Sequence, residues 1–267
     1  MKNLLLLSLF SILCFFSCNG KDPGQNVRIV CHRGFWKSAA VPNAQNSIAS
    51  LSQAQSNTYW GSEFDLHLTA DGEIIVNHDP KIGSLPIHTT PYAVLAQQRL
   101  ANGEKPSTLD EYLNQGALSS TKLVLELKPQ DTPEKGIELA QKSIGKLREH
   151  QLLDPDRIMF ISFDLGICAY IARELPQFCN QYLEGDKTPE ELHEMGINGI
   201  DYHYMVFALH PDYVKRCHDL GMTVNVWTVD SLHQMKKLVA MGVDAITTNQ
   251  PDPLRKLLGE REIQAGN

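Results

Sequence analysis

Residues 122–150 read KLVLELKPQDTPEKGIELAQKSIGKLREH, one strand pattern followed by one helix pattern. The apolar run at residues 122–127 has the length and the side chains of a buried strand. Thr132 and Pro133 then supply a capping residue and a proline at the first helical position, which predicts a helix from there to about His150. A buried strand followed directly by a helix is the unit from which parallel sheets are built.

The same unit recurs along the whole chain. Seven more short apolar runs read as strands, at residues 27–31, 62–68, 157–162, 181–183, 199–202, 223–229 and 244–247. Eight strand–helix units in one domain of this length predict an α/β fold of the (β/α)8 TIM barrel type. An open doubly wound sheet is the alternative, but no G-x-G-x-x-G motif follows any of these strands.

One connection is much longer than the others. Residues 68–105 separate the second strand from a helix that begins near Ser107. They include a further extended arm at residues 73–76, directly after an Asp71-Gly72 turn. We predict that this small insertion after strand 2 forms a hairpin and a loop over the barrel mouth, and that it carries His78 to that mouth.

The first 17 residues have the pattern of an export signal. Lys2 precedes an apolar run at residues 4–16, and this run is too short to span a membrane comfortably as a helix. Ser17 and Cys18 follow it, and this order resembles a bacterial lipoprotein signal, in which Cys18 becomes the lipidated first residue. Residues 1–17 are therefore predicted to be a signal peptide.

The rest of the chain is predicted to consist of a short tether and one domain. Residues 18–26 are predicted to be a tether, and residues 27–267 a single domain. We expect an exported protein that is either periplasmic or anchored to the outer membrane through a lipid at Cys18. Because Phe15 and Phe16 stand where such signals have small or aliphatic residues, ordinary signal cleavage is the alternative.

The composition argues against a nucleic-acid-binding protein. The 24 Lys and Arg residues and 31 Asp and Glu residues give a formal charge of −7, and the chain has no basic patch. The cysteines beyond Cys18 lack the close spacing of a metal site, and Cys31 lies inside an apolar strand, where it is expected to pack as a small hydrophobe. No disulfide framework and no protein partner are inferred.

Ionisable residues gather at the ends of three consecutive predicted strands. They are His32 and Arg33 after the first strand, Glu63 and Asp65 in the second, and Glu126 and Lys128 at the end of the third. Because the carboxyl ends of barrel strands meet at one rim, where barrel active sites form, we expect these side chains to lie close together. His78 in the insertion adds a second imidazole to the same rim.

These residue types indicate metal-assisted phosphoryl chemistry. Two imidazoles can share general acid and base work, and an Arg and a Lys suit phosphate oxygens. Glu63 and Asp65 are two positions apart on a strand and point the same way, and with Glu126 they offer the carboxylate oxygens that Mg²⁺ and Ca²⁺ prefer. Zinc sites usually have more nitrogen or sulfur ligands than this group offers. His67 lies on the same strand face, so a zinc-like variant of the site remains open.

Several motifs follow one another in a recognisable order. They are His32-Arg33-Gly34, Asn46-Ser47, Glu63-Phe64-Asp65, Asn77-His78-Asp79, Leu125-Glu126-Leu127-Lys128, Ser162-Phe163-Asp164, Val226-Trp227-Thr228-Val229 and Thr247-Thr248-Asn249-Gln250-Pro251. Over nearly all of the chain after the leader, this order resembles the glycerophosphodiester phosphodiesterase family. The resemblance implies a (β/α)8 barrel with a small insertion after strand 2. It also implies metal-dependent hydrolysis of glycerophosphodiesters to glycerol 3-phosphate and an alcohol.

The resemblance further implies a role for each residue of the rim group. It assigns the acid–base pair to His32 and His78, the site of one divalent cation (Mg²⁺ or Ca²⁺) to Glu63, Asp65 and Glu126, and substrate binding to Arg33, Lys128 and Trp227. The nucleophile is either the substrate's own glycerol 2-hydroxyl or water. A structural role is expected for His203, near the end of the sixth strand.

One position departs from the family pattern. The family usually reads Pro-Glu-Asn-Thr where this chain has Ala44-Gln45-Asn46-Ser47. Gln45 can accept a hydrogen bond from Arg33 in the substrate site, but it supplies no charge. The substrate is therefore open to an alternative, a related phosphodiesterase acting on a lysophospholipid or a phosphoinositide headgroup. A second alternative is a non-catalytic phosphodiester-binding lipoprotein, which the intact set of histidines and carboxylates disfavours.

Overall fold

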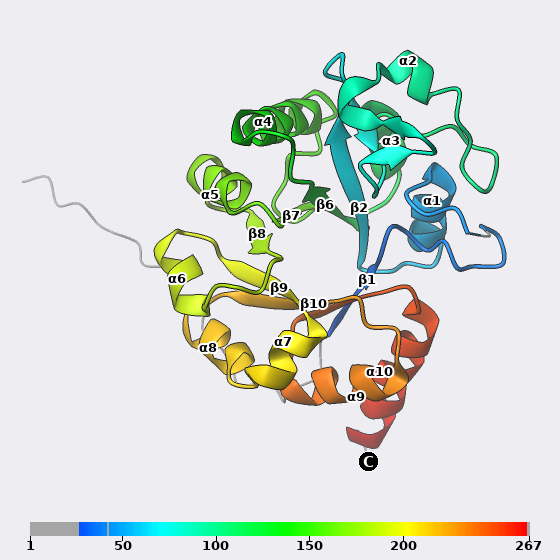
Figure 1. The fold of residues 1–267 in the computed structure, drawn as a ribbon. Coiled ribbons are helices and arrows are strands. Elements are labelled where there is room, and N and C mark those ends of the chain that lie inside the picture. The colour runs from blue at the N-terminus through cyan, green and yellow to red at the C-terminus, as the bar shows by residue number, and fades with distance from the viewer. Residues whose placement is uncertain (1–26, 42, 266–267) are drawn as a thin grey trace, which may run out of the picture.

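The computed structural model describes residues 27–41 and 43–265. Eight parallel strands in this part of the chain close into a barrel (Figure 1). They are β1 (Arg28–Cys31), β2 (Gly61–Leu68), β6 (Lys122–Leu127), β7 (Ile158–Ser162), β8 (Cys179–Tyr182), β9 (Gly199–His203), β10 (Thr223–Trp227) and β11 (Ala245–Thr248). Because β1 pairs with both β2 and β11, the ring is complete. The predicted (β/α)8 barrel is confirmed and the open doubly wound sheet is excluded.

Helices surround the barrel (Figure 1). They are α1 (Ile48–Ser56), α3 (Leu109–Gly116), α4 (Pro133–Glu149), α5 (Leu165–Glu174), α6 (Pro189–Glu194), α7 (Tyr204–Leu209), α8 (Tyr213–Asp219), α9 (Leu232–Met241) and α10 (Pro251–Ala265). The cap predicted for α4 is present, because the Thr132 side chain accepts the N–H of Lys135 and Pro133 is the first helical residue. Satisfying the otherwise unpaired N–H groups of the first turn fixes where this helix begins.

Apolar side chains fill the space on both sides of the strands. Outside the barrel, Leu125 and Leu127 of β6 belong to the same buried cluster as Leu139 and Ile144 of α4. A smaller cluster fills part of the interior, with Val30, Val124, Met159, Ile161, Leu183 and Ala245 as its buried members. Because side chains two positions apart point to the same face of a strand, β6 directs Glu126 inward with Val124.

The insertion folds back on the barrel. β3 (Ile74–Val76) pairs antiparallel with the end of β2, so that Val76 lies opposite Leu66. The hairpin strands β4 (Lys81–Ile82) and β5 (Leu85–Pro86), the 3-10 helix η1 (Ile87–Thr89) and the short helix α2 (Tyr92–Leu95) follow. Because β3 runs back along β2, the N–H of Asn77 donates to the carbonyl of Asp65 at 3.0 Å. His78, the next residue, is thereby carried to the barrel mouth as predicted.

Several local details differ from the sequence prediction. The insertion was predicted as a hairpin and a loop, but it also contains the short helices η1 and α2. Helix α7 was not predicted; it begins directly after β9 and is six residues long, which is too short for a periodic pattern to stand out. The strand predicted at residues 181–183 lies at Cys179–Tyr182 instead. Asn180 is an unfavourable strand residue, but its buried side-chain amide donates to the carbonyl of Cys168 at 2.8 Å, which compensates for its burial.

The predicted signal peptide, the tether and Cys18 lie outside the described residues. Within residues 27–41 and 43–265, every helix is too short or too polar to cross a lipid bilayer. The four cysteines in this part of the chain are free thiols, and Cys31 is fully buried in the apolar core, as expected.

Candidate active site

The turn that follows β1 is built around Gly34. Its φ of +80° lies in the left-handed region, and a Cβ at this position would come within 2.3 Å of Oγ of Ser50. Arg33 also has a positive φ, of +57°, which is unfavourable for a residue with a side chain. This backbone directs the N–H of Arg33 at Oε2 of Glu63, 2.7 Å away, and so joins the turn to the second strand.

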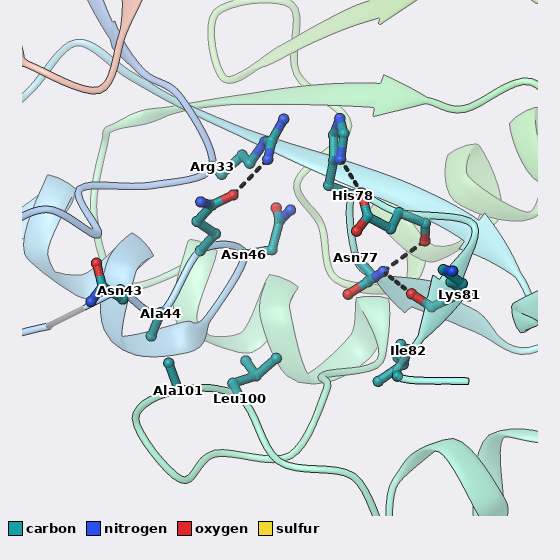
Figure 2. Close-up of a pocket in the computed structure, with 13 residues that line it drawn as sticks. Arg33, Asn43, Ala44, Asn46, Asn77, His78, Lys81, Ile82, Leu100 and Ala101 are labelled. Atoms are coloured by element: carbon teal, nitrogen blue, oxygen red, sulfur yellow. Dashed lines mark hydrogen bonds and ion pairs between the residues drawn. The ribbon is translucent and has the colours of Figure 1, made fainter. Parts of the chain in front are cut away.

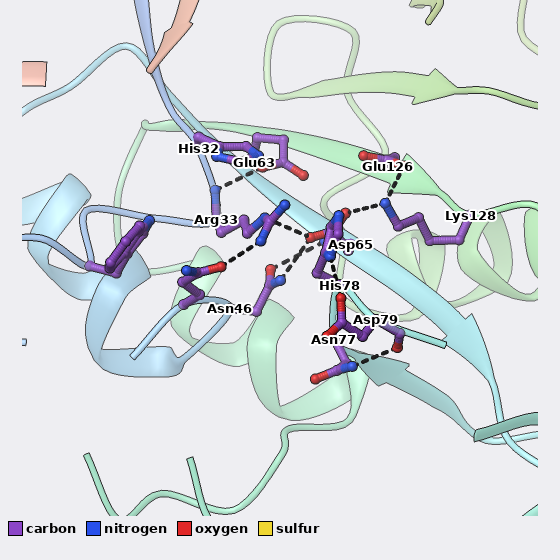
Figure 3. Close-up of polar contacts among 12 residues, drawn as sticks. His32, Arg33, Asn46, Glu63, Asp65, Asn77, His78, Asp79, Glu126 and Lys128 are labelled. Carbon is purple, nitrogen blue, oxygen red and sulfur yellow. Dashed lines mark hydrogen bonds and ion pairs between the residues drawn. The ribbon is translucent and has the colours of Figure 1, made fainter. Parts of the chain in front are cut away.

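Three buried carboxylates come together from two neighbouring strands (Figure 3). Glu63 and Asp65 lie on β2 and Glu126 on β6, where Asp65 and Glu126 are direct partners in register. One oxygen from each lies within 4.8 Å of the other two. Burial and the charge of Asp65 raise the pKa of Glu63 well above its usual range, and the same two causes raise the pKa of Glu126 to about 8.

This group fits a hard divalent cation. Oε1 of Glu63 is buried and has no hydrogen-bond partner, so a cation would satisfy it and offset the repulsion among the carboxylates. His67, which left a zinc-like site open, is not a member of this group, and its Nε2–H donates to the carbonyl of His78 at 3.2 Å. The donor set therefore consists of oxygen atoms, which favours Mg²⁺ or Ca²⁺ over zinc.

Two basic residues lie against Asp65. Nζ of Lys128 is 2.9 Å from Oδ1 of Asp65 and 2.6 Å from Oε1 of Glu126, while Nε of Arg33 is 3.7 Å from Oδ2 of Asp65. The side-chain amide of Asn46 also donates to Oδ2 of Asp65 at 2.7 Å. Burial alone would raise the pKa of Asp65, but Lys128 and these other neighbours hold it below its usual range. Asp65 is thus the carboxylate of the group that ionises most readily.

His32 is half-buried, and an amide holds its ring. Its Nδ1 lies 2.9 Å from Oδ1 of Asn249, which also accepts the indole N–H of Trp36 at 3.0 Å. Nδ2 of Asn249 donates to Asp230 at 2.9 Å. Because an indole N–H can only donate and an ionised carboxylate can only accept, these contacts fix the amide with its oxygen toward His32. His32 therefore carries its hydrogen on Nδ1, and Nε2 is the nitrogen that can take a proton.

The ring of His32 is hydrogen-bonded to a neutral amide, whereas the ring of His78 is hydrogen-bonded to a carboxylate. Burial and the charge of Arg33 lower the pKa of His32 to about 4. Nδ1 of His78 instead lies 2.7 Å from Oδ1 of Asp79, a carboxylate. Burial lowers the pKa of His78 too, but the charge of Asp65 and the hydrogen bond with Asp79 oppose this change. The protonated ring is thus better stabilised at His78 than at His32.

Gln45 lies beside Arg33, as the sequence predicts. Its Oε1 accepts a hydrogen bond from Nη1 of Arg33 at 2.5 Å. This contact holds the guanidinium group at the edge of the carboxylate group without adding a negative charge to it.

Trp227 lies at the end of β10. Its indole N–H donates to the carbonyl of Asp201 at 2.7 Å, and its ring packs edge-on against Phe163 and His203, with centroids 5.4 and 5.3 Å apart. The ring is therefore held rigidly by the ends of neighbouring strands, and His203 supports it, which agrees with the structural role expected for that histidine.

Three polar residues of the site were not assigned a role from the sequence. Asn46 binds Asp65, Asn249 binds His32, and Asp230 accepts from both the backbone N–H and the side chain of Asn249. Asn46 and Asn249 stand within the motifs Asn46-Ser47 and Thr248-Asn249, so a signal was present for two of them. Asp230 follows β10 in a loop and carries no such signal.

This chain is similar in sequence and in structure to proteins of one enzyme family. Residues 32–253 match the model of the glycerophosphoryl diester phosphodiesterase family. A crystal structure of a glycerophosphodiester phosphodiesterase from Parabacteroides distasonis has a TM-score of 0.86 and 42% identity, covering 91% of this chain and 100% of that one. A glycerophosphodiester phosphodiesterase from Caldanaerobacter subterraneus is 25% identical, over 86% of this chain and 97% of its own length.

A more distant structure shares the fold. It is a phosphodiesterase from Oleispira antarctica in complex with the product sn-glycerol-3-phosphate, with a TM-score of 0.75 and 23% identity, covering 87% of this chain and 96% of that one. Since the family model matches most of the chain, this chain belongs to the glycerophosphoryl diester phosphodiesterase family.

Proposed function

We propose that this protein hydrolyses glycerophosphodiesters to glycerol 3-phosphate and an alcohol, and that it requires one divalent cation, Mg²⁺ or Ca²⁺. The observation that carries the proposal is the oxygen-only group of Glu63, Asp65 and Glu126, with one histidine held by an amide and another held by a carboxylate at the same rim. The names of the relatives and the product bound to the Oleispira antarctica protein support this class of substrate.

The charges of the site suit a phosphodiester. Glu63, Asp65 and Glu126 would hold the cation, which when bound supplies Lewis-acid stabilisation of the charge on the phosphoryl oxygens. Arg33 and Lys128 would bind the remaining phosphate oxygens. With a divalent cation present, these three acidic and two basic side chains leave one net positive charge, which matches the single negative charge of the substrate.

The two histidines would divide the proton transfers. His32 presents an unprotonated Nε2, so it would take the proton of the nucleophile, which is the glycerol 2-hydroxyl of the substrate or a water molecule. His78, with its carboxylate partner, would give a proton to the leaving oxygen. Trp227 would line the pocket near the glycerol or the leaving group, where its fixed ring can exclude water.

We also propose that the protein acts outside the cytoplasm. Residues 1–17 would be removed as a signal peptide, Cys18 would be lipidated, and residues 18–26 would tether the barrel to the membrane. Mass spectrometry of the membrane fraction tests this, with a diacylglyceryl adduct expected on Cys18 and lost in Cys18→Ala. An unmodified N-terminus after residue 17 would contradict the lipid anchor but not export, and a retained leader would contradict both.

The activity is tested with the purified domain. With Mg²⁺ or Ca²⁺ it should release glycerol 3-phosphate from water-soluble glycerophosphodiesters, and a chelator should abolish the release. The same panel should include a lysophospholipid and a phosphoinositide. Turnover of these lipids in place of the soluble esters would favour the related phosphodiesterase, and metal-independent ligand binding without any turnover would favour a binding lipoprotein.

A further inference from the structure

Helix α1 begins beside the active site, and a residue of the insertion completes its first turn. The first four N–H groups of a helix have no partner within the helix itself. Ser47 and Ser50 satisfy two of these groups by exchanging hydrogen bonds, at 3.2 and 2.9 Å. The other two, those of Ile48 and Ala49, donate to Oε2 and Oε1 of Glu104 at 3.0 and 3.3 Å. A single carboxylate, 56 residues after Ile48, therefore holds half of this helix terminus.

The carboxylate of Glu104 is itself held by the loop that carries it. The side-chain amide of Asn102 donates to Oε1 of Glu104 at 2.7 Å, and its oxygen accepts the backbone N–H of Glu104 at 3.2 Å. Helix α1 has no acidic residue in its own first turn. Glu104 therefore also supplies the negative charge that the positive end of the helix dipole favours.

The two residues that lie directly before Ser47 belong to the active site. The amide of Asn46 donates to Asp65 at 2.7 Å, and Gln45 accepts from Arg33 at 2.5 Å (Figure 3). Asn46 has a φ of +55°, an uncommon conformation that must be held by contacts on both of its sides. On one side its N–H donates to the carbonyl of Arg33 at 3.0 Å, and on the other side the first turn of α1 begins.

The insertion and the loop before α1 face one another across a cavity of about 260 Å³ (Figure 2). Ala44 and Asn46 lie on one side of it, and His78 and Leu100 on the other. The two contacts of Glu104 join these sides. They link the segment that brings a histidine to the site with the segment that brings the amides.

We propose that Glu104 is a positioning residue for the cation and the phosphate, and that it acts through Asn46 and Gln45. The inference rests on the function proposed above, since it concerns how that site is held. Without the carboxylate, the N–H groups of Ile48 and Ala49 would lose their partner in the protein, and the first turn of α1 would fray. The amide of Asn46 would then leave the carboxylate group, and Gln45 would leave the guanidinium group.

The variant Glu104→Gln tests this role. It keeps the size of the side chain but replaces one accepting oxygen by an NH2 group, which cannot accept a hydrogen bond. In calorimetric titration with Mg²⁺ or Ca²⁺ the purified domain should bind the cation about tenfold more weakly, and KM for a soluble glycerophosphodiester should rise about tenfold. The value of kcat should change less, because Asn249 holds the ring of His32 independently of Glu104.

Glu191→Gln is the matched control. Glu191 accepts the N–H of Thr188 at 2.7 Å at the start of α6. This helix follows β8, which lies across the barrel from β1. The control should lower stability to urea about as much as Glu104→Gln does, and it should leave cation affinity and KM unchanged.

A second variant tests whether Glu104 acts through Asn46. Asn46→Ala should weaken cation binding, and the double variant with Glu104→Gln should bind the cation no more weakly than Asn46→Ala alone. Losses that add in the double variant, unchanged cation affinity in Glu104→Gln, or an equal loss in Glu191→Gln would overturn the positioning role. A wild type that releases no glycerol 3-phosphate, while Glu104→Gln still weakens cation binding, would overturn the hydrolase function and support the positioning role.

Discussion

The ring of His32 donates its Nδ1 hydrogen to Oδ1 of Asn249 across 2.9 Å, and this contact joins the end of the first barrel strand to the end of the last. Asp230 and Trp36 fix the amide of Asn249 in turn, so the tautomer of His32 is set by groups that need not touch the substrate. The proton-accepting nitrogen of the site is therefore positioned by the closure of the barrel.

Loss of this contact should affect the chemical step. Asn249→Ala frees the ring of His32 to rotate and change tautomer, and we expect kcat to fall by about a hundredfold with a smaller change in KM. Asn249→Asp is the matched variant, because a carboxylate partner raises the pKa of His32 and should move the acid limb of the pH–rate profile to higher pH. Unchanged kcat in Asn249→Ala would contradict the positioning role.

Burial of His32 should make stability depend on pH. Burial lowers the pKa of His32 from its ordinary value of 6.5 to about 4 in the folded protein, so between these values the unfolded chain binds a proton that the folded one does not. The free energy of unfolding therefore decreases as pH falls through this window, by on the order of 3 kcal/mol from this residue. Urea unfolding at pH 7 and pH 4, without divalent cation, should show a smaller decrease in His32→Asn than in the wild type, and equal decreases would contradict the assignment.

Cation binding should release protons at neutral pH. The pKa of Glu126 is raised to about 8 and that of Glu63 is also raised, so a fraction of these groups is protonated at pH 7 until a cation displaces the protons. We expect release on the order of one proton per ion. Calorimetric titration with Mg²⁺ or Ca²⁺ in buffers of different ionisation enthalpy measures this release, and a heat that does not depend on the buffer would show that the carboxylates are already ionised.

The turn at Gly34 should tolerate no side chain. In Gly34→Ala the new Cβ would overlap Ser50 at a φ of +80°, and we expect a loss of about 3 kcal/mol or more in the free energy of unfolding. Gly221→Ala is the control, because Gly221 has a similar φ of +71° but open space around it, so strain of about 1 kcal/mol is expected there. Equal losses in the two variants would show that the contact with Ser50 has no effect of its own.

The barrel and much of its rim were predictable from local patterns. Strand β6 and helix α4 follow from an apolar run and a Thr-Pro cap, and the i, i+2 spacing of Glu63 and Asp65 fixes their common direction on β2. The antiparallel arm also places His78 at the rim, as expected. The turn at Asp71-Gly72 reverses the chain, so β3 pairs antiparallel with β2 and ends near the rim. The family resemblance added the roles, which local patterns do not specify.

What the sequence did not predict depends on contacts between distant residues. His32 and Asn249 are 217 positions apart, so their hydrogen bond follows from closure of the barrel and from no local signal. His67 shares a strand face with Glu63 and Asp65, yet its ring turns to the carbonyl of His78, a residue of the inserted loop. Helix α7 was missed because six residues are too few to show a period.

The central claim, that His32 accepts a proton and His78 donates one, is tested most directly by changing the leaving group. The rates of wild type, His32→Ala and His78→Ala are compared on an alkyl ester of glycerol 3-phosphate and on its p-nitrophenyl ester, whose leaving group needs no proton. His78→Ala should lose about a hundredfold or more on the alkyl ester and little on the p-nitrophenyl ester, while His32→Ala should lose activity on both. Equal losses of the two variants on both esters would contradict this division of roles.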